Sequence, residues 1–206
     1  MFPRHQEWRP IFGQAGAAQG HLRNNNIGPG DLFLFWGVFR EVEVWGDGYR
    51  FKKEASPKHI IWGWLHVDRK YSVDSVGDGE LEWAKYHPHF QIKGVSQNTV
   101  YTARETLSLP GDVAFSCEGV GVFHEIKDKL ILTERKSSKP SLWSLPSWFF
   151  PVGNRAPLTY HQKLKLWRNN GDNVLLNSAA RGQEFILNCT DYPEAVGWLK
   201  SLFLNA

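Results

Sequence analysis

Two histidines flank one proline in the segment His87-Pro88-His89, and this spacing can support chemistry. In an extended segment, residues two apart share a face, so both imidazoles can bind one metal ion or relay protons. The proline holds the segment extended, and the alternative is a loop whose imidazoles only hydrogen-bond to the backbone. His66 and Glu105 are further candidates for a catalytic polar site. Because the spacing lacks the specificity of a ligand signature, we predict no metal and no cofactor.

Aromatic residues make up 14% of the chain, which contains 10 Trp. Such side chains either fill a core or form a surface on which bases stack. Alternation along a strand places Trp62 and Trp64 on one face, and a neighbouring strand can bring Trp36 beside them. The sequence therefore predicts an aromatic cage for a base. The alternative is a tryptophan-rich core.

Basic residues alternate with tryptophans in the second half of the chain. Lys139 lies close to Trp143 and Trp148, and Lys163 and Arg168 follow later. In grooves that bind nucleic acid, cations contact phosphates while indoles contact bases. The pattern predicts that these five residues contact nucleic acid. The alternative is a solvated surface on which aliphatic stems cover apolar residues.

Other enzyme classes and locations are disfavoured. The chain contains no GxxxxGK[ST] loop and no strand-GxGxxG-helix unit, which argues against NTP-driven and NAD-dependent enzymes. Cys117 has His124 seven positions later but no third orienting residue, so a nucleophilic site is weakly supported. The first ten residues resemble no secretory signal, so we expect free thiols and a cytoplasmic protein. The longest apolar run, residues 32–39, is shorter than the roughly 20 residues that span a bilayer.

The elements that must position these residues follow from periodicity and turn signals. Small apolar residues at helical spacing predict a helix that the asparagines at 24–26 terminate, and a last helix follows Pro193. Alternation and β-branched content predict about seven strands. The expected strand segments are 32–45, 49–54, 59–73, 98–109, 120–126 paired with 129–134, and 173–178 paired with 183–188.

A chain of 206 residues with 42% apolar and 22% charged residues has the composition of one globular domain. We therefore expect a single domain over residues 1–206, with residues 1–12 as a surface segment. Residues 135–157 contain four prolines and no period, which indicates a loop anchored by its aromatic residues. The fold class that we predict is α+β, with a mixed, curled β-sheet or small barrel and helices packed at its ends.

The segment from residue 8 to residue 67 resembles the start of the PUA-like superfamily, particularly its EVE and YTH members. In those domains a short helix precedes a Gly-Asp turn, an apolar strand ends on an aromatic residue, and the next strand has a glycine before a valine. The matching residues are Gln14, Ala15, Leu22, Gly30, Asp31, Phe35, Trp36, Gly63 and Val67. The resemblance implies a PUA-like fold with a ligand beside Gly30, Asp31 and Trp36.

A closer resemblance covers almost the whole chain. It rests on the segments WRPIFGQAGAAQGHL, GDLFLFWGVFR, HIIWGWLHV, YHPHF, NTVYTA, SLWSLPSWFFP and RGQEFIL, in this order. They are similar to a bacterial and phage family named nucleotide modification associated domain, type three. Its neighbourhood among DNA-modifying enzymes implies a system rather than a defined reaction. The implied partners are nucleic acid, above all DNA with a modified base, and other proteins of a modification system.

With these resemblances, the sequence predicts a PUA-like module that binds a modified or flipped base in nucleic acid, in which Gln14 reads the edge of that base. A base that leaves the stack loses stacking energy, for which an aromatic pocket compensates. The alternative is a base- or nucleotide-modifying enzyme that uses the histidine-rich polar site. A third hypothesis is an interaction protein with an exposed apolar patch at residues 142–151.

Overall fold

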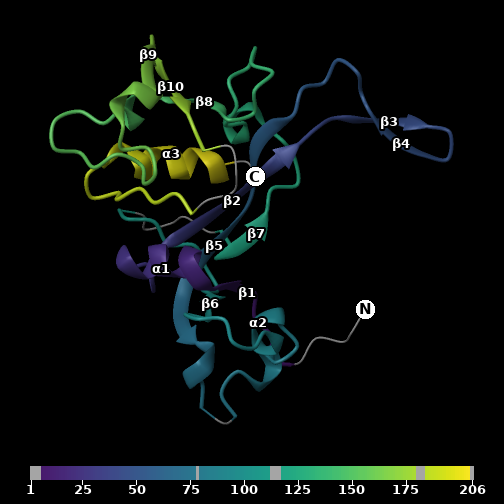
Figure 1. Ribbon diagram of the computed structural model, residues 1–206, viewed down its shortest axis with the longest axis vertical. Coiled ribbons are helices and arrows are strands. Elements are labelled where there is room, and N and C mark those ends of the chain that lie inside the picture. The colour runs from purple at the N-terminus through teal and green to yellow at the C-terminus, as the bar shows by residue number, and fades with distance from the viewer. Residues whose placement is uncertain (1–5, 78, 112–116, 180–183, 205–206) are drawn as a thin grey trace. The chain divides into compact units, whose positions relative to one another are not determined.

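The computed structural model describes residues 6–77, 79–111, 117–179 and 184–204 (Figure 1). The chain divides into two compact units. The first unit comprises residues 1–33 and 64–121, and the second comprises residues 34–63 and 122–206. The expectation of a single domain stays a prediction. The predicted α+β class is confirmed, since strands and helices follow one another throughout the described ranges.

The described ranges contain ten strands and three α-helices, with short 3₁₀ helices between them. The strands are β1 (Ile11–Gln14), β2 (Leu32–Phe39), β3 (Val42–Trp45), β4 (Gly48–Phe51), β5 (Lys58–Ser72), β6 (Thr99–Ala103), β7 (Val120–Val122), β8 (Leu142–Pro146), β9 (Trp167–Asn170) and β10 (Asn173–Asn177). The α-helices are α1 (Gly16–Asn24), α2 (Pro88–Gln91) and α3 (Glu194–Phe203). Within these ranges no helix is long and apolar enough to cross a membrane.

Three sheets organise the strands. The largest has the order β1-β6-β5-β2, with β7 also paired to β5. β6 is antiparallel to both β1 and β5, and a register shift between Val67 and Arg69 marks a bulge in β5. Such a bulge bends the strand that carries it. The second sheet has the order β8-β10-β9 and is antiparallel, and β3 and β4 form a separate antiparallel ribbon.

In the first unit, asparagine and glycine residues end α1 and form the turn that precedes β2, as predicted. α1 ends where the asparagine run begins, with Asn25 as C-cap and Asn26 at φ +58°. Gly30 takes φ +93°, and its N–H donates to the carbonyl of Val67 at 2.9 Å. The N–H of Val67 donates to the carbonyl of Asp31 at 2.9 Å, which fixes this turn against β5. Val67 is fully buried in the core of the unit.

The second unit has a strand where the sequence predicted a loop. Residues 142–146 form β8, in which buried Trp143 and Leu145 alternate with half-buried neighbours. Pro146 is the last residue of β8, an edge strand of its sheet, and such positions tolerate proline because no ladder hydrogen bond is lost. The prolines of this segment therefore limit the strand and do not prevent it.

Three further expectations on the elements differ from the structure. Residues 120–126 do not pair with 129–134, because β7 pairs with β5 and Ile131 forms a bridge to Ile60. β10 pairs with β8 and β9, whereas the predicted hairpin to 183–188 includes residues outside the described ranges. β1 begins at Ile11, inside the segment 1–12 that we expected on the surface, and residues 1–5 lie outside the described ranges.

Candidate nucleic-acid interface

Trp36 is part of an aromatic group in the core of the second unit. Its ring lies 4.5 Å from that of His59 and 5.2 Å from that of Trp143, edge to face with the latter. The ring of Phe185 stacks on Trp36 at 5.7 Å with an interplanar angle of 19°. Trp36 and Phe185 are half-buried, while His59 and Trp143 are buried. The group thus has a closed inner side and a partly open outer side.

His59 is held in one tautomer by its neighbours. The indole Nε1 of Trp143 donates a hydrogen bond to Nδ1 of His59 at 2.8 Å, so the ring proton of a neutral His59 sits on Nε2. The backbone N–H of His59 donates to the hydroxyl of Thr133 at 2.7 Å. Burial lowers the pKa of His59 below its ordinary value of 6.5. The imidazole therefore acts as a neutral acceptor that fixes the indole of Trp143.

Trp62 lies on the other face of the same strands. Its ring stacks on that of Phe35 at 5.5 Å with an interplanar angle of 24°. The residue is 41% exposed, which is unusual for an indole that already packs on one side. Gly37 lies beside this indole, because a Cβ there would make ordinary van der Waals contact, at 3.7 Å, with Cδ1 and Nε1 of Trp62 and a closer one, at 3.3 Å, with Phe39. Trp62 and Phe35 form the stacking platform.

Trp36 and Trp62 of the predicted cage lie on opposite faces of their sheet. Phe35 and Trp36 are adjacent on β2, so alternation sends their side chains to opposite faces, and Trp62 follows Phe35. Trp64 is only 6% exposed in the first unit, where its Nε1 donates to the carbonyl of Glu118 at 2.9 Å. The segment that starts at Glu118 covers its ring, and a Cβ at Gly121 would lie 2.6 Å from it. Trp64 is therefore a core residue.

His87 and His89 lie together in the first unit. Their rings are 5.4 Å apart, and Nδ1 of His87 accepts from the backbone N–H of His89 at 3.3 Å as the N-cap of α2. Asn98 holds His89 through two contacts, at 2.5 Å to Nδ1 and 2.7 Å to its carbonyl. His89 also packs on Gly13 so closely that a Cβ there would lie 2.3 Å from its ring. Burial, and then the charge of His89, lower the pKa of His87.

The other two candidates for a catalytic polar site have different surroundings. His66 is buried, and its Nδ1 accepts from the N–H of Ser108 at 3.3 Å. Burial, and then the charge of Arg104, lower the pKa of His66. Glu105 is exposed. Within the described ranges no group of three or more His, Cys, Asp or Glu side chains could hold a metal ion. This geometry favours structural roles for the imidazoles.

The remaining predicted contacts are spread over the molecule. Oε1 of Gln14 accepts from the N–H of Ala15 at 3.0 Å, just before α1. Trp148 is half-buried and stacks on Phe149 at 3.9 Å. The basic candidates Lys139, Lys163 and Arg168 are exposed. A role for any of these residues in binding nucleic acid stays a prediction.

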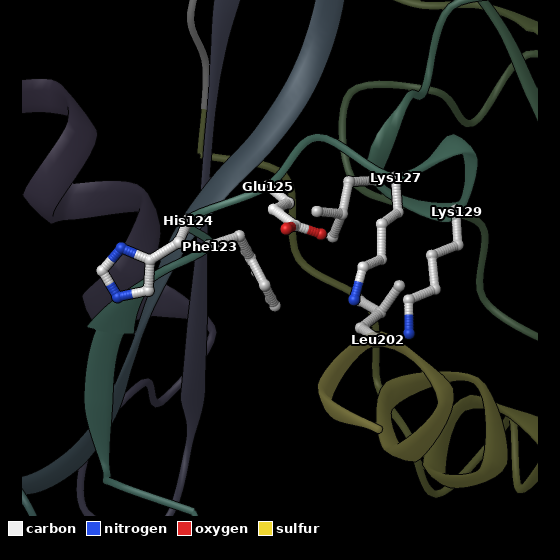
Figure 2. A pocket seen from close by; sticks show the side chains of 7 residues that line it. Phe123, His124, Glu125, Lys127, Lys129 and Leu202 are labelled. Atoms are coloured by element: carbon white, nitrogen blue, oxygen red, sulfur yellow. The ribbon is translucent and has the colours of Figure 1, made fainter. Parts of the chain in front are cut away.

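A pocket of about 300 Å³ lies in the second unit, where the backbone N–H of Phe123 donates to the carbonyl of Trp62 at 2.9 Å (Figure 2). Its lining residues are Phe123, His124, Glu125, Lys127, Lys129, Leu130 and Leu202. Figure 2 shows the side chains of Lys127 and Lys129 directed toward α3. Lys129 Nζ donates to the carbonyls of Leu204, at 2.8 Å, and Ser201. Burial, and then the charge of Lys127, lower the pKa of Lys129.

Sequence reasoning did not select the pocket, Phe185 or the buried His59. The local signals were His124 and the lysines at 127 and 129, which belong to the basic residues of the second half of the chain and stand at the turn of a predicted strand pair. Phe185 meets Trp36 only through the tertiary fold, because 149 positions separate them in the chain. Contacts at that separation leave no periodic trace in a single sequence.

Comparisons with known proteins give one finding. No curated protein and no solved structure matches the chain. The model of one protein family, described as nucleotide modification associated domain 3, matches residues 1–188. The matched range includes Trp62, Phe35 and the aromatic group around Trp36. A match over most of the chain makes this protein a member of the nucleotide modification associated domain 3 family.

Proposed function

We propose that the protein binds nucleic acid by stacking one unpaired base on the exposed indole of Trp62. The observation that carries the proposal is the stacking platform: Trp62 is 41% exposed, and Phe35 supports it from one side. An aromatic side chain stacked under a base contributes about 1–3 kcal/mol. Membership of a family associated with nucleotide modification supports a base as the occupant.

The neighbouring residues suit a nucleotide more than a free base. The pocket begins at Phe123, whose backbone is hydrogen-bonded to that of Trp62. Lys127 lines the pocket with its side chain directed toward α3, and it would supply a cation to a phosphate that enters the pocket. The exposed Lys139, Lys163 and Arg168 would then contact phosphates further along the strand. The ligand that we propose is DNA in which a modified or flipped base has left the stack.

The aromatic group around Trp36 supports the platform from the opposite face. Trp36 is fixed by His59 and Trp143, so the β2 backbone beneath Phe35 has little freedom. A platform that is rigid before binding loses less conformational entropy when the base docks. We therefore assign Trp36 and Trp143 as positioning residues and Trp62 as the residue that contacts the base.

The test compares three variants by fluorescence anisotropy of labelled oligonucleotides. The panel contains single-stranded DNA and duplexes with unmodified, modified and mismatched bases. Trp62→Ala should weaken binding by about 5- to 150-fold, the equivalent of about 1–3 kcal/mol. Trp62→Phe retains a flat ring and should keep most of the affinity. The matched control is Trp45→Ala, because Trp45 is also exposed, at 62%, but lies on β3.

Two outcomes would overturn the proposal. The first is that no oligonucleotide in the panel binds to the wild-type protein. The second is that Trp45→Ala weakens binding as much as Trp62→Ala does. A stronger effect on duplexes with modified or mismatched bases than on paired unmodified duplexes would identify an extruded base as the ligand, since such bases leave the stack at lower cost.

A further inference from the structure

Strands β3 and β4 form a ribbon that pairs with no other described strand. The register places Val42 opposite Phe51, Glu43 opposite Arg50 and Val44 opposite Tyr49. A two-stranded hairpin is marginally stable in water unless one of its faces is covered. Alternation gives this ribbon two faces of different chemistry, and each can be examined for what covers it.

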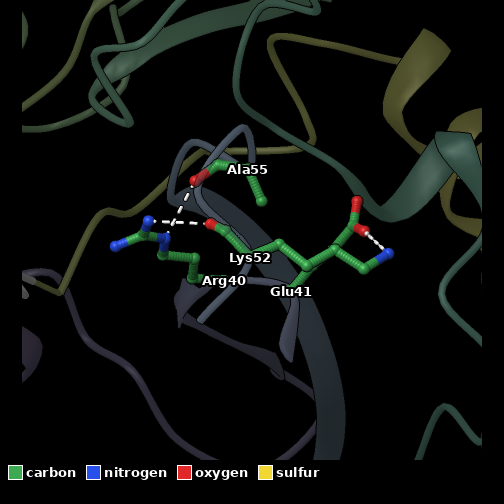
Figure 3. Close-up of polar contacts among 4 residues, drawn as sticks. All are labelled: Arg40, Glu41, Lys52 and Ala55. Atoms are coloured by element: carbon green, nitrogen blue, oxygen red, sulfur yellow. Dashed lines mark hydrogen bonds and ion pairs between the residues drawn. The ribbon is translucent and has the colours of Figure 1, made fainter. Parts of the chain in front are cut away.

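The polar face of the ribbon is satisfied by its own residues. Arg50 Nε lies 2.6 Å from Oε1 of Glu43, and the guanidinium stacks 3.4 Å from the ring of Trp45. The next cross-strand pair joins Lys52 Nζ to Oε2 of Glu41 at 2.8 Å (Figure 3). Each charge of these two pairs therefore has its partner within the ribbon.

The apolar face, formed by Val42, Val44, Tyr49 and Phe51, is uncovered. These residues are 49%, 73%, 77% and 58% exposed. Arg40 borders the face at the base of the ribbon, where its guanidinium lies 5.0 Å from the ring of Phe51. That guanidinium donates to the carbonyls of Ala55, at 2.8 Å, and Lys52, at 2.9 Å (Figure 3). Arg40 thus fixes the base of the ribbon and is already hydrogen-bonded to the backbone.

We propose that the apolar face is the surface through which two copies of this chain associate about a two-fold axis. The charge of the ribbon favours a second copy of this chain as the partner. Residues 38–55 contain four basic and four acidic side chains, so two ribbons do not repel each other. Lys53 and Glu54 are exposed where β4 ends, so each copy presents both signs at the rim and a two-fold arrangement can pair them reciprocally.

The same chemistry argues against a nucleic acid on this face. Phosphates need cations, and the apolar face presents four uncharged side chains with one guanidinium already bound to two carbonyls. An isologous contact covers the apolar faces of both copies at once.

The experiment measures molecular mass by sedimentation equilibrium over a wide range of protein concentration. Wild-type protein should form a dimer. Val44→Lys should raise the dissociation constant about a hundredfold or more, because the axis brings two like charges together on a small face. Val44→Glu should do the same. An equimolar mixture of the two variants should recover a dimer, since opposite charges then meet.

The control is Trp45→Ala, which changes an exposed neighbour of Val44 on the polar face and should leave the dimer intact. Circular dichroism and thermal melting of each variant exclude misfolding. A wild-type protein that stays monomeric at all concentrations would overturn the proposal. So would a Val44→Lys variant that remains dimeric, or a mixture of the charged variants that stays monomeric. None of these results depends on nucleic acid, so the proposal can fail independently of the proposed function.

Discussion

Burial, more than neighbouring charge, sets the behaviour of individual histidines in this protein. His59, His66, His87 and His161 all have pKa values lowered from 6.5, with burial as the largest cause in each. His161 shows how a neutral, buried imidazole can form hydrogen bonds through both of its ring nitrogens. Its Nε2 accepts from the N–H of Ala179 at 3.2 Å, and its Nδ1 donates to the carbonyl of Thr159 at 2.9 Å.

These histidines predict a loss of stability in mild acid. A histidine whose pKa is lower in the folded than in the unfolded chain takes up its proton more readily on unfolding. Stability is therefore complete above the ordinary pKa of 6.5 and falls as the pH drops below it. His59→Asn keeps an acceptor near the indole N–H of Trp143 and should flatten this dependence. Urea denaturation between about pH 8 and pH 5 measures it.

The matched control is His124→Asn, which changes an exposed histidine. Comparison of the two variants separates the effect of losing the buried His59 from that of replacing a histidine by asparagine. A His59→Asn variant with an unchanged slope would show that this imidazole is not a source of the acid sensitivity.

At the scale of elements, glycines show where the backbone has room and where it has none. A Cβ at Gly119, just before β7, would lie 2.1 Å from the carbonyl oxygen of Arg104. The backbone itself would have to move to relieve such a contact. At Gly197, within α3, a Cβ would meet nothing within 4 Å. The two positions should therefore respond to the same substitution with opposite signs.

Gly197→Ala should raise the free energy of unfolding by about 0.5–1 kcal/mol, because alanine loses less backbone entropy in a helix. Gly119→Ala should lower it by about 1–3 kcal/mol through steric overlap. Chemical denaturation of both variants beside the wild type measures the two shifts. A Gly119→Ala variant as stable as the wild type would mean that this segment can relax without cost.

Periodicity predicted the elements that depend on neighbouring residues. α1, β5, the β3–β4 turn at Gly46 and the start of α3 after Pro193 lie where spacing and turn residues indicate. Which strands pair with each other was harder to predict, because β7 pairs with β5, which lies far from it in the sequence. β8 was missed because its two-residue alternation is short and bordered by prolines.

The site was predictable only in part, for a geometric reason. The sequence singled out Trp36 and Trp62, and both lie in the second unit. Alternation puts adjacent Phe35 and Trp36 on opposite faces, but the sequence could not show which of the two packs on Trp62. Nor could the sequence show that Gly121 and the residues next to it cover the indole of Trp64. That segment is distant from Trp64 in the sequence.

At the scale of the whole molecule, a net charge of +3 means that any attraction to nucleic acid comes from local groups. Stacking and phosphate contacts respond differently to salt, since only the latter release counterions. Trp62→Ala should lower affinity equally at every salt concentration. Lys163→Gln and Arg168→Gln should each reduce the slope of log affinity against log salt by about 1.

Titrations of one labelled oligonucleotide at several ionic strengths separate these contributions. Equal slopes for Lys163→Gln and the wild-type protein would place that lysine away from the phosphates. A shallower slope for Trp62→Ala would mean that the indole positions a charged contact as well as a base.

The edges of the ribbon bear on whether association stops at two chains. Unpaired strand edges can recruit further strands without limit, which is how fibrils grow. Here the acidic Glu41 and Glu43 pair across the polar face with the basic Lys52 and Arg50, and Lys53 and Glu54 follow shortly after β4. Charged side chains along both strands disfavour the addition of a third strand. The ribbon therefore has one apolar face that can associate and two charged edges that disfavour further strand pairing. This combination favours a closed dimer over an open polymer.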